Sequence, residues 1–159
     1  MDAMLNDFRN NTQTIIDFLV GLDETTALKK ARDDSWNAME CMEHVFVSEK
    51  GIHKLLNRPD LFSNQKPIED EALEKFKDFK YKAPEFILPK GRFSSLKEMV
   101  SAFKVSRSEL ETWIANELHN SGEDTAPHPI LGPLTKNQWI RFVINHSERH
   151  LNQMKASML

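Results

Sequence analysis

The sequence has little cysteine and no long apolar run. Cys41 is the one cysteine among the 159 residues, which excludes a disulfide framework within the chain. No uninterrupted apolar stretch approaches the roughly 20 residues that a membrane-spanning helix needs. Residues 1–13 are polar and lack the basic and apolar segments of a secretory signal. We therefore expect a cytoplasmic protein with no membrane partner.

Concentrated positive charge is also absent. The 21 Lys and Arg residues are scattered along the chain and are outnumbered by 24 Asp and Glu residues, for a net charge of -3. Binding to duplex nucleic acid needs a concentrated basic footprint, so we expect no nucleic-acid partner. The length fits a single domain over residues 1–159 that buries its own core.

Proline and glycine are scarce and unevenly placed. All seven prolines lie within residues 59–89 and 127–133. Because proline removes a helix donor and clashes with the preceding turn, long helices are expected only outside these stretches. With a turn near Gly21, four helical segments remain: 2–20, about 34–57, 95 to about 122, and 135 to nearly the C-terminus.

Helix-start signals support these segments. Asp34 or Ser35 is a good N-cap for the second helix. Ser95 with Glu98, and Thr135 with Gln138, form capping boxes that begin the third and fourth helices.

Four amphipathic helices of about 19 to 27 residues, or roughly 30–40 Å, predict an all-α four-helix bundle. The link over 58–94 is too long for a hairpin turn, so we expect a long crossover between helices 2 and 3, with a short helix over Glu69–Lys80. Only residues 86–88 resemble a strand, and they are too few to predict one.

Two histidines of the fourth helix lie on its apolar face. His146 and His150 share that face with Trp139, Phe142 and Val143, and their i, i+4 spacing lets both imidazoles reach one ion. One buried histidine is usually a core residue that hydrogen bonds to a neighbouring helix. Two on one apolar face bring four ring nitrogens that need partners, so the pair favours a shared metal ion.

A third ligand has to come from another helix. His44 lies on the flank of the apolar face of the second helix, where it can point into the gap between two helices. Three histidines with an open fourth position are the catalytic arrangement of a zinc-like ion. A structural triad, or a polar core cluster without metal, stays open as an alternative.

The other histidines are weaker candidates. We expect His53 at the surface and His119 in solvent at the end of the third helix. His128 lies in the proline-rich loop before the last helix, where it either lines the mouth of a site or stabilises the turn.

Glu49 and Gln153 are the candidate catalytic residues. Glu49 falls on the inward face of the second helix, where it accepts a hydrogen bond from a ligand imidazole, acts as a general base, or turns outward to solvent. Gln153 shares the face of the two histidines and is a candidate to orient a ring or the substrate.

Two stretches of the sequence resemble a known family. The run from His128 to Gln153 contains G-x-L-T-x-x-Q-W followed by His146-Ser-Glu-Arg-His150, and the second helix contains Ser35-Trp-Asn-Ala-Met-Glu-Cys-Met-Glu-His44. Together they resemble the DinB/YfiT-like superfamily. The resemblance implies an up-down-down-up four-helix bundle, usually a homodimer. It also implies one divalent metal ion, typically nickel or zinc, bound by His44, His146 and His150.

The resemblance also suggests a reaction. Relatives include S-transferases that use the thiols bacillithiol or mycothiol, and a mycothiol-dependent maleylpyruvate isomerase. The leading hypothesis is thus a metal-dependent thiol S-transferase with a small-molecule substrate and a low-molecular-weight thiol. A metal-dependent hydrolase, and a non-catalytic metal-stabilised dimeric stress or binding module, are the alternatives. Imidazole ligands do not decide the ion, and iron and manganese stay open beside nickel and zinc.

Overall fold

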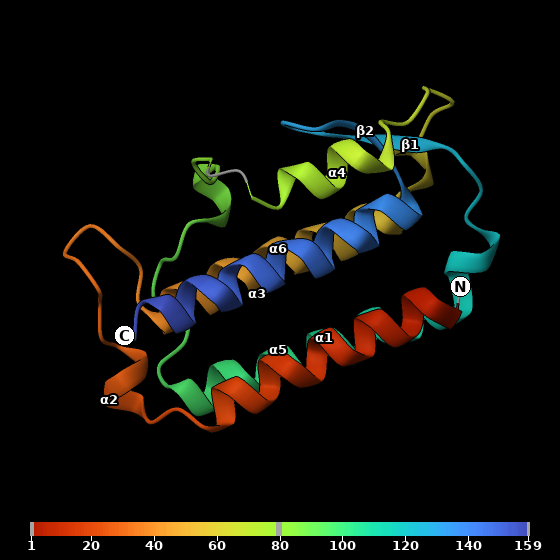
Figure 1. Cartoon of the computed structure of the whole chain (residues 1–159). Coiled ribbons are helices and arrows are strands. Elements are labelled where there is room, and N and C mark those ends of the chain that lie inside the picture. Colours follow the sequence, from red (N-terminus) through yellow and green to blue (C-terminus); the bar gives the residue numbers. More distant parts are fainter. Residues whose placement is uncertain (1, 79–80, 159) are drawn as a thin grey trace.

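Four long helices form the body of the computed structural model, which describes residues 2–78 and 81–158. They are α1 (Asp2–Val20), α3 (Ala38–Leu56), α5 (Leu96–Glu117) and α6 (Lys136–Ala156). Helices α1 and α3 each pack against both α5 and α6. In Figure 1, α1 and α6 run in one direction along the bundle, and α3 and α5 run in the other. The predicted all-α, up-down-down-up four-helix bundle is confirmed.

The beginning of α3 differs from the prediction. Its N-cap is Asn37, not Asp34 or Ser35. The Asn37 side chain accepts a hydrogen bond from the Glu40 backbone N–H at 2.8 Å, and the Glu40 carboxylate accepts one from the Asn37 backbone N–H at 3.0 Å. Asn is as good an N-cap as Asp or Ser, and the Glu three residues later completes a capping box. The helix therefore begins where both donors are satisfied.

Of the two predicted capping boxes, one forms in full and the other only in part. At α6, Thr135 and Gln138 make both hydrogen bonds of the predicted capping box. At α5, the Ser95 hydroxyl accepts from the Glu98 backbone N–H, but the Glu98 carboxylate bonds to Ser94 instead. Helix α5 also ends at Glu117, before the predicted Gly122, and continues as the 3-10 turn η3 (Leu118–Asn120).

The crossover between α3 and α5 is present. It contains η1 (Pro59–Leu61), α4 (Asp70–Phe76) and η2 (Glu85–Ile87). Helix α4 packs on α6 and runs along the side of the bundle away from α1 and α5 (Figure 1). The predicted helix over Glu69–Lys80 is shorter than expected, and its last two residues, 79–80, lie outside the described residues. A short helix, α2 (Glu24–Ala27), follows α1.

The prediction that no strand forms is wrong. Strands β1 (Thr125–His128) and β2 (Gly132–Thr135) pair antiparallel, with Thr125 opposite Thr135 and His128 opposite Gly132. Gly132 has φ +99, a conformation that favours glycine. The segment that most resembled a strand, 86–88, instead lies in and beside η2. The prolines of the 125–135 segment indicated a loop, and its two strands are too short to show the alternation of apolar and polar residues that predicts a hairpin.

A polar layer divides the bundle core into two apolar clusters. One cluster includes Phe8 and Leu110, and the other includes Phe103. Between them, both carboxylate oxygens of Glu49 accept hydrogen bonds from the Arg107 guanidinium at 2.7 Å. Each of these two side chains is 1% exposed.

The remaining contacts of the Arg107 guanidinium come from α1 and α5. It donates to the Asn11 and Thr12 side chains, each at 2.8 Å. It also lies over the rings of Phe8 and Phe103, at 4.7 and 4.9 Å from their centroids. A buried ion pair with every partner satisfied fixes how the helices fit together, since sliding one helix would leave a charge unpaired.

Among the described residues, no helix combines the length and apolar character needed to cross a membrane.

We predict that Arg107→Met destabilises the fold by about 3–5 kcal/mol, because it leaves the Glu49 carboxylate buried without its cation. The double variant Arg107→Met with Glu49→Leu should recover most of this loss, since neither charge then remains. Urea unfolding followed by circular dichroism in the presence of a chelator measures both. Equal stability of the single and double variants would contradict the assigned role of the pair.

Candidate metal centre

Three histidines meet between α3 and α6. His44 comes from α3, His146 and His150 come from α6, and all three side chains are buried. Each offers one nitrogen ligand atom, and these three atoms lie within 4.8 Å of one another. The Nε2 atoms of His44 and His146 are 3.0 Å apart. Because α3 packs directly on α6, the flank position of His44 points at the other two rings. The structure thus brings the three predicted ligands together.

The second ring nitrogen of two histidines has a fixed partner. The Nδ1 of His44 lies 2.9 Å from the backbone carbonyl oxygen of Ile87. The Nδ1 of His150 lies 2.9 Å from the Gln153 Oε1. Because these oxygens only accept, each Nδ1 carries the proton and donates it. The Nε2 lone pairs of both rings are therefore left for the centre. The contact between Gln153 and His150 is the one through which the predicted orienting role of Gln153 would act.

His146 is held differently. Its ring stacks on Phe142 with centroids 5.3 Å apart, and its buried Nδ1 has no hydrogen-bond partner among the described residues. In the absence of a metal ion, the one proton that can lie among the three converging nitrogens is on the His146 Nε2. The cluster is therefore rich in lone pairs and poor in donors.

All three rings are held neutral. Burial lowers the pKa of His150 to about 3, with a further contribution from His44 and Arg149 nearby. Burial also lowers the pKa of His146 well below its usual value, and the neighbouring histidines add to this. For His44, burial lowers the pKa although the bond to Ile87 opposes it. Neutral imidazoles are the form that binds metal ions, so at neutral pH a ring needs at most to move its proton from one nitrogen to the other.

The donor set is compatible with a divalent ion. Two nitrogens bound to one tetrahedral ion at about 2.0–2.1 Å lie about 3.3 Å apart, close to the separation of the His44 and His146 Nε2 atoms. Within residues 2–78 and 81–158, no further His, Cys, Asp or Glu joins the cluster. Cys41 is buried in an apolar cluster, and burial raises its pKa to about 12, so it stays a protonated core thiol.

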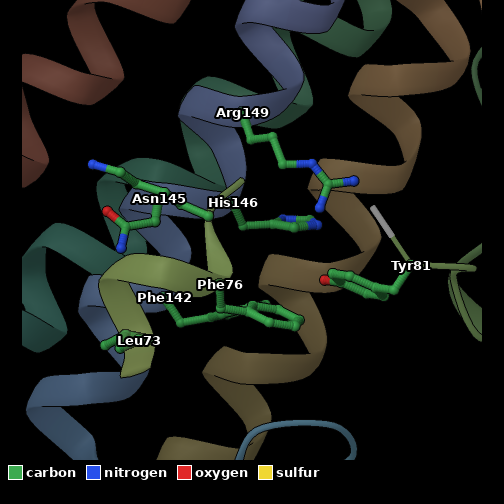
Figure 2. Close-up of a pocket in the computed structure, with 8 residues that line it drawn as sticks. Leu73, Phe76, Tyr81, Phe142, Asn145, His146 and Arg149 are labelled. Carbon is green, nitrogen blue, oxygen red and sulfur yellow. The ribbon is translucent and has the colours of Figure 1, made fainter. Parts of the chain in front are cut away.

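Aromatic side chains surround the centre. The Trp36 ring lies 5.0 Å from His44 and 6.3 Å from His150, measured between centroids. A small hollow lies beside His146, where the ring points toward Arg149 and Tyr81 (Figure 2). The lining side chains come from α4, the crossover and α6, and are Leu73, Phe76, Lys77, Tyr81, Phe142, Asn145 and Arg149. The Arg149 guanidinium lies over the Tyr81 ring at 5.2 Å and gives the hollow a positive side.

Glu49 is not part of the centre. It lies on the inward face of α3, as predicted, but both carboxylate oxygens are bound by Arg107. Among the described residues, its hydrogen bonds go to Arg107 and to none of the three histidine rings. The expected roles of ring partner and general base are therefore not supported by its position. The ring partner on this side is the Ile87 carbonyl, which sequence patterns did not indicate.

The remaining histidines lie elsewhere. His119 is exposed and His53 is partly exposed. His128 is buried, and its Nδ1 accepts hydrogen bonds from the backbone N–H groups of Ile130 and Leu131, each at 3.1 Å. Of its two predicted roles, stabilising the turn is the one that these bonds show.

The chain resembles known proteins in sequence and in fold. A family profile described as the DinB superfamily matches residues 7–154. The chain belongs to the DinB superfamily. An uncharacterized protein of Bacillus subtilis, YuaE, is 32% identical over 139 residues, which is 86% of each chain. A solved structure described as TT2238, a four-helix bundle protein, matches 98% of each chain with a TM-score of 0.67 and 20% identity. At this identity, the likeness shows the fold alone.

The buried His128 should make the stability of the fold depend on pH. Burial lowers its pKa to about 4, whereas the unfolded chain titrates near 6.5. Between these values the unfolded state binds a proton that the folded state does not. The contribution of His128 to stability is thus complete above about pH 6.5. It is lost toward pH 4, by up to about 1.4 kcal/mol per pH unit.

In urea unfolding with a chelator present, His128→Asn should lose stability less steeply than the wild type between pH 6.5 and 4. The exposed His119→Asn should follow the wild-type slope. Identical pH slopes for the wild type and His128→Asn would show that the buried ring does not titrate in this way.

Proposed function

We propose that this DinB-superfamily protein is a metal-dependent enzyme of the thiol S-transferase type. It holds one divalent ion with His44, His146 and His150, and zinc and nickel are the leading candidates. The observation that carries the proposal is the convergence of three neutral imidazoles with no fourth ligand among the described residues. Structural zinc sites have four protein ligands, whereas catalytic sites leave one position to water or substrate.

The chain prepares this centre with its own groups. The Ile87 carbonyl and the Gln153 amide oxygen hold two rings with Nε2 inward. Trp36 and Phe142 lie against the rings and limit the access of water. An ion bound there supplies positive charge that lowers the pKa of a thiol or of water beside it. Arg149, which lies beside the hollow, adds positive charge on this side of the centre.

A thiol substrate is supported over the alternatives. Cys41 is a buried, protonated core residue, so a nucleophilic sulfur at this centre has to arrive with a substrate. A general base near the ion would favour a hydrolase, but Glu49, the carboxylate predicted for that role, is bound by Arg107. A purely structural metal module would fill the fourth position with a protein ligand. The choice of a thiol itself rests on the resemblance to S-transferases.

All three proposed ligands come from one chain, from α3 and α6. Dimerisation, which the family resemblance implies, and a cytoplasmic location stay predictions. Neither is needed for the two tests below.

The first test is metal binding. Protein purified without a histidine tag should contain close to one equivalent of a divalent ion by elemental analysis. His146→Ala should bind added zinc at least about 100-fold more weakly, because losing a ligand matters at least as much as losing an outer hydrogen-bond partner. His119→Ala, changed at an exposed histidine, should bind like the wild type. A metal content near zero in both the wild type and His146→Ala, with no binding of added ions, would refute the proposal.

The second test addresses the thiol. A cobalt-substituted sample should change its visible absorption when 2-mercaptoethanol, cysteine or glutathione is added, because a thiolate is a strong ligand for such an ion. Ethanol and serine, which have hydroxyls in place of thiols, serve as controls and should leave the spectrum unchanged. No response to any of these thiols would remove the S-transferase assignment and leave metal binding intact.

A further inference from the structure

Glu43 is a buried carboxylate next to a proposed ligand. It precedes His44 on α3 and is 4% exposed. Its oxygens accept hydrogen bonds from three consecutive backbone N–H groups, those of Lys90 at 2.7 Å, Gly91 at 3.0 Å and Arg92 at 3.3 Å. The Arg92 guanidinium also donates to it. Four donors from one short segment of the crossover thus converge on a single side chain of α3.

The turn over 88–92 is shaped to present these donors. Gly91 has φ +72, and a Cβ at this position would meet nothing within 4 Å. Glycine therefore serves the backbone conformation here and does not relieve crowding. Successive N–H groups in such a turn form a concave anion-binding arrangement. The Arg92 guanidinium also donates to the Leu88 carbonyl at 3.1 Å, which closes the turn on itself.

The same segment supplies the partner of His44. The Ile87 carbonyl, next to this turn, accepts the Nδ1 proton of His44 at 2.9 Å. Two adjacent residues of α3 therefore hold the end of the crossover at two points. If the turn shifts, the His44 Nδ1 proton loses its acceptor. The ring is then free to take the other tautomer, whose protonated Nε2 cannot bind a metal ion.

We propose that Glu43 is a positioning residue of the metal centre, which holds the turn 88–92 so that the Ile87 carbonyl fixes the orientation and tautomer of His44. Glu43 acts through the backbone of the crossover and makes no contact of its own with an ion or substrate. The affinity part of this inference rests on the proposed metal binding. The tautomer part concerns the metal-free protein and stands independently of it.

Glu43→Gln is the decisive variant. Glutamine keeps the size and shape of the side chain, but its amide group turns two N–H donors toward the donors of the turn. Glu148→Gln is the matched control, since it removes one negative charge from an exposed side chain that lies two residues from both His146 and His150. Any loss caused by long-range electrostatics alone would appear in the control as well.

Two measurements test this role: the tautomer of His44 and the affinity for zinc. Nitrogen-15 NMR of the imidazoles in metal-free protein should show His44 as the Nδ1–H tautomer in the wild type and in Glu148→Gln. Glu43→Gln should show a mixture of tautomers. Zinc titration of the same proteins should show affinity weakened about tenfold in Glu43→Gln, as for other groups that orient a ligand ring. A role limited to fastening the crossover would lower the melting temperature without changing the tautomer.

The outcomes are separable. A folded Glu43→Gln with the wild-type tautomer and zinc affinity overturns the inference, whatever its melting temperature. If Glu43→Gln does not fold, Arg92→Ala weakens the same turn through a side chain that is 33% exposed. Arg92→Ala should shift the tautomer in the same direction, and its failure to do so also overturns the inference. A wild type that binds no zinc refutes the proposed function, while the tautomer still decides the role of Glu43.

Discussion

Three imidazoles are packed into the seam between α3 and α6, and every ring nitrogen there needs a partner once water is excluded. This requirement organises the surrounding structure. The crossover has to bring the Ile87 carbonyl to His44, and the last turns of α6 have to bring Gln153 to His150. Once both bonds are made, the free nitrogens point at one another, and the cluster lacks the protons to satisfy them. A shared cation is the simplest way to satisfy those lone pairs.

The bundle also buries a second polar cluster, in which the donors and acceptors satisfy one another. In the layer built on Glu49 and Arg107, each charge faces its opposite and the remaining guanidinium donors reach α1. Such a closed network serves the fit of the helices and offers nothing to a ligand. The histidine cluster is open, because its acceptors outnumber its donors. The contrast explains why the most buried carboxylate of α3 belongs to the scaffold, whereas the three histidines belong to the site.

Sequence reasoning succeeded where the signal was local. The i, i+4 spacing of His146 and His150 on an apolar face placed both on one side of α6, and the clustering of proline located the four helices. It failed where a residue's role is decided by a partner far along the chain. The helical pattern of the sequence predicted that Glu49 lies on the inward face of its helix. It could not predict that Glu49 pairs with Arg107, which is 58 residues away. A backbone carbonyl such as that of Ile87 is present at every residue, so no pattern of side chains indicates its role. The 125–135 hairpin is too short to show the alternation of apolar and polar residues that predicts a strand.

We propose that one divalent ion is held by three imidazoles and by no other protein group. X-ray absorption spectroscopy of the zinc-loaded wild type tests this most directly, because it reports the number and kind of atoms bound to the metal. We expect three imidazole nitrogens at about 2.0–2.1 Å and one further light atom, which should exchange for sulfur when a thiol is added. A zinc ion with fewer than three imidazole ligands, or with a fourth ligand from the protein that a thiol cannot displace, would contradict it.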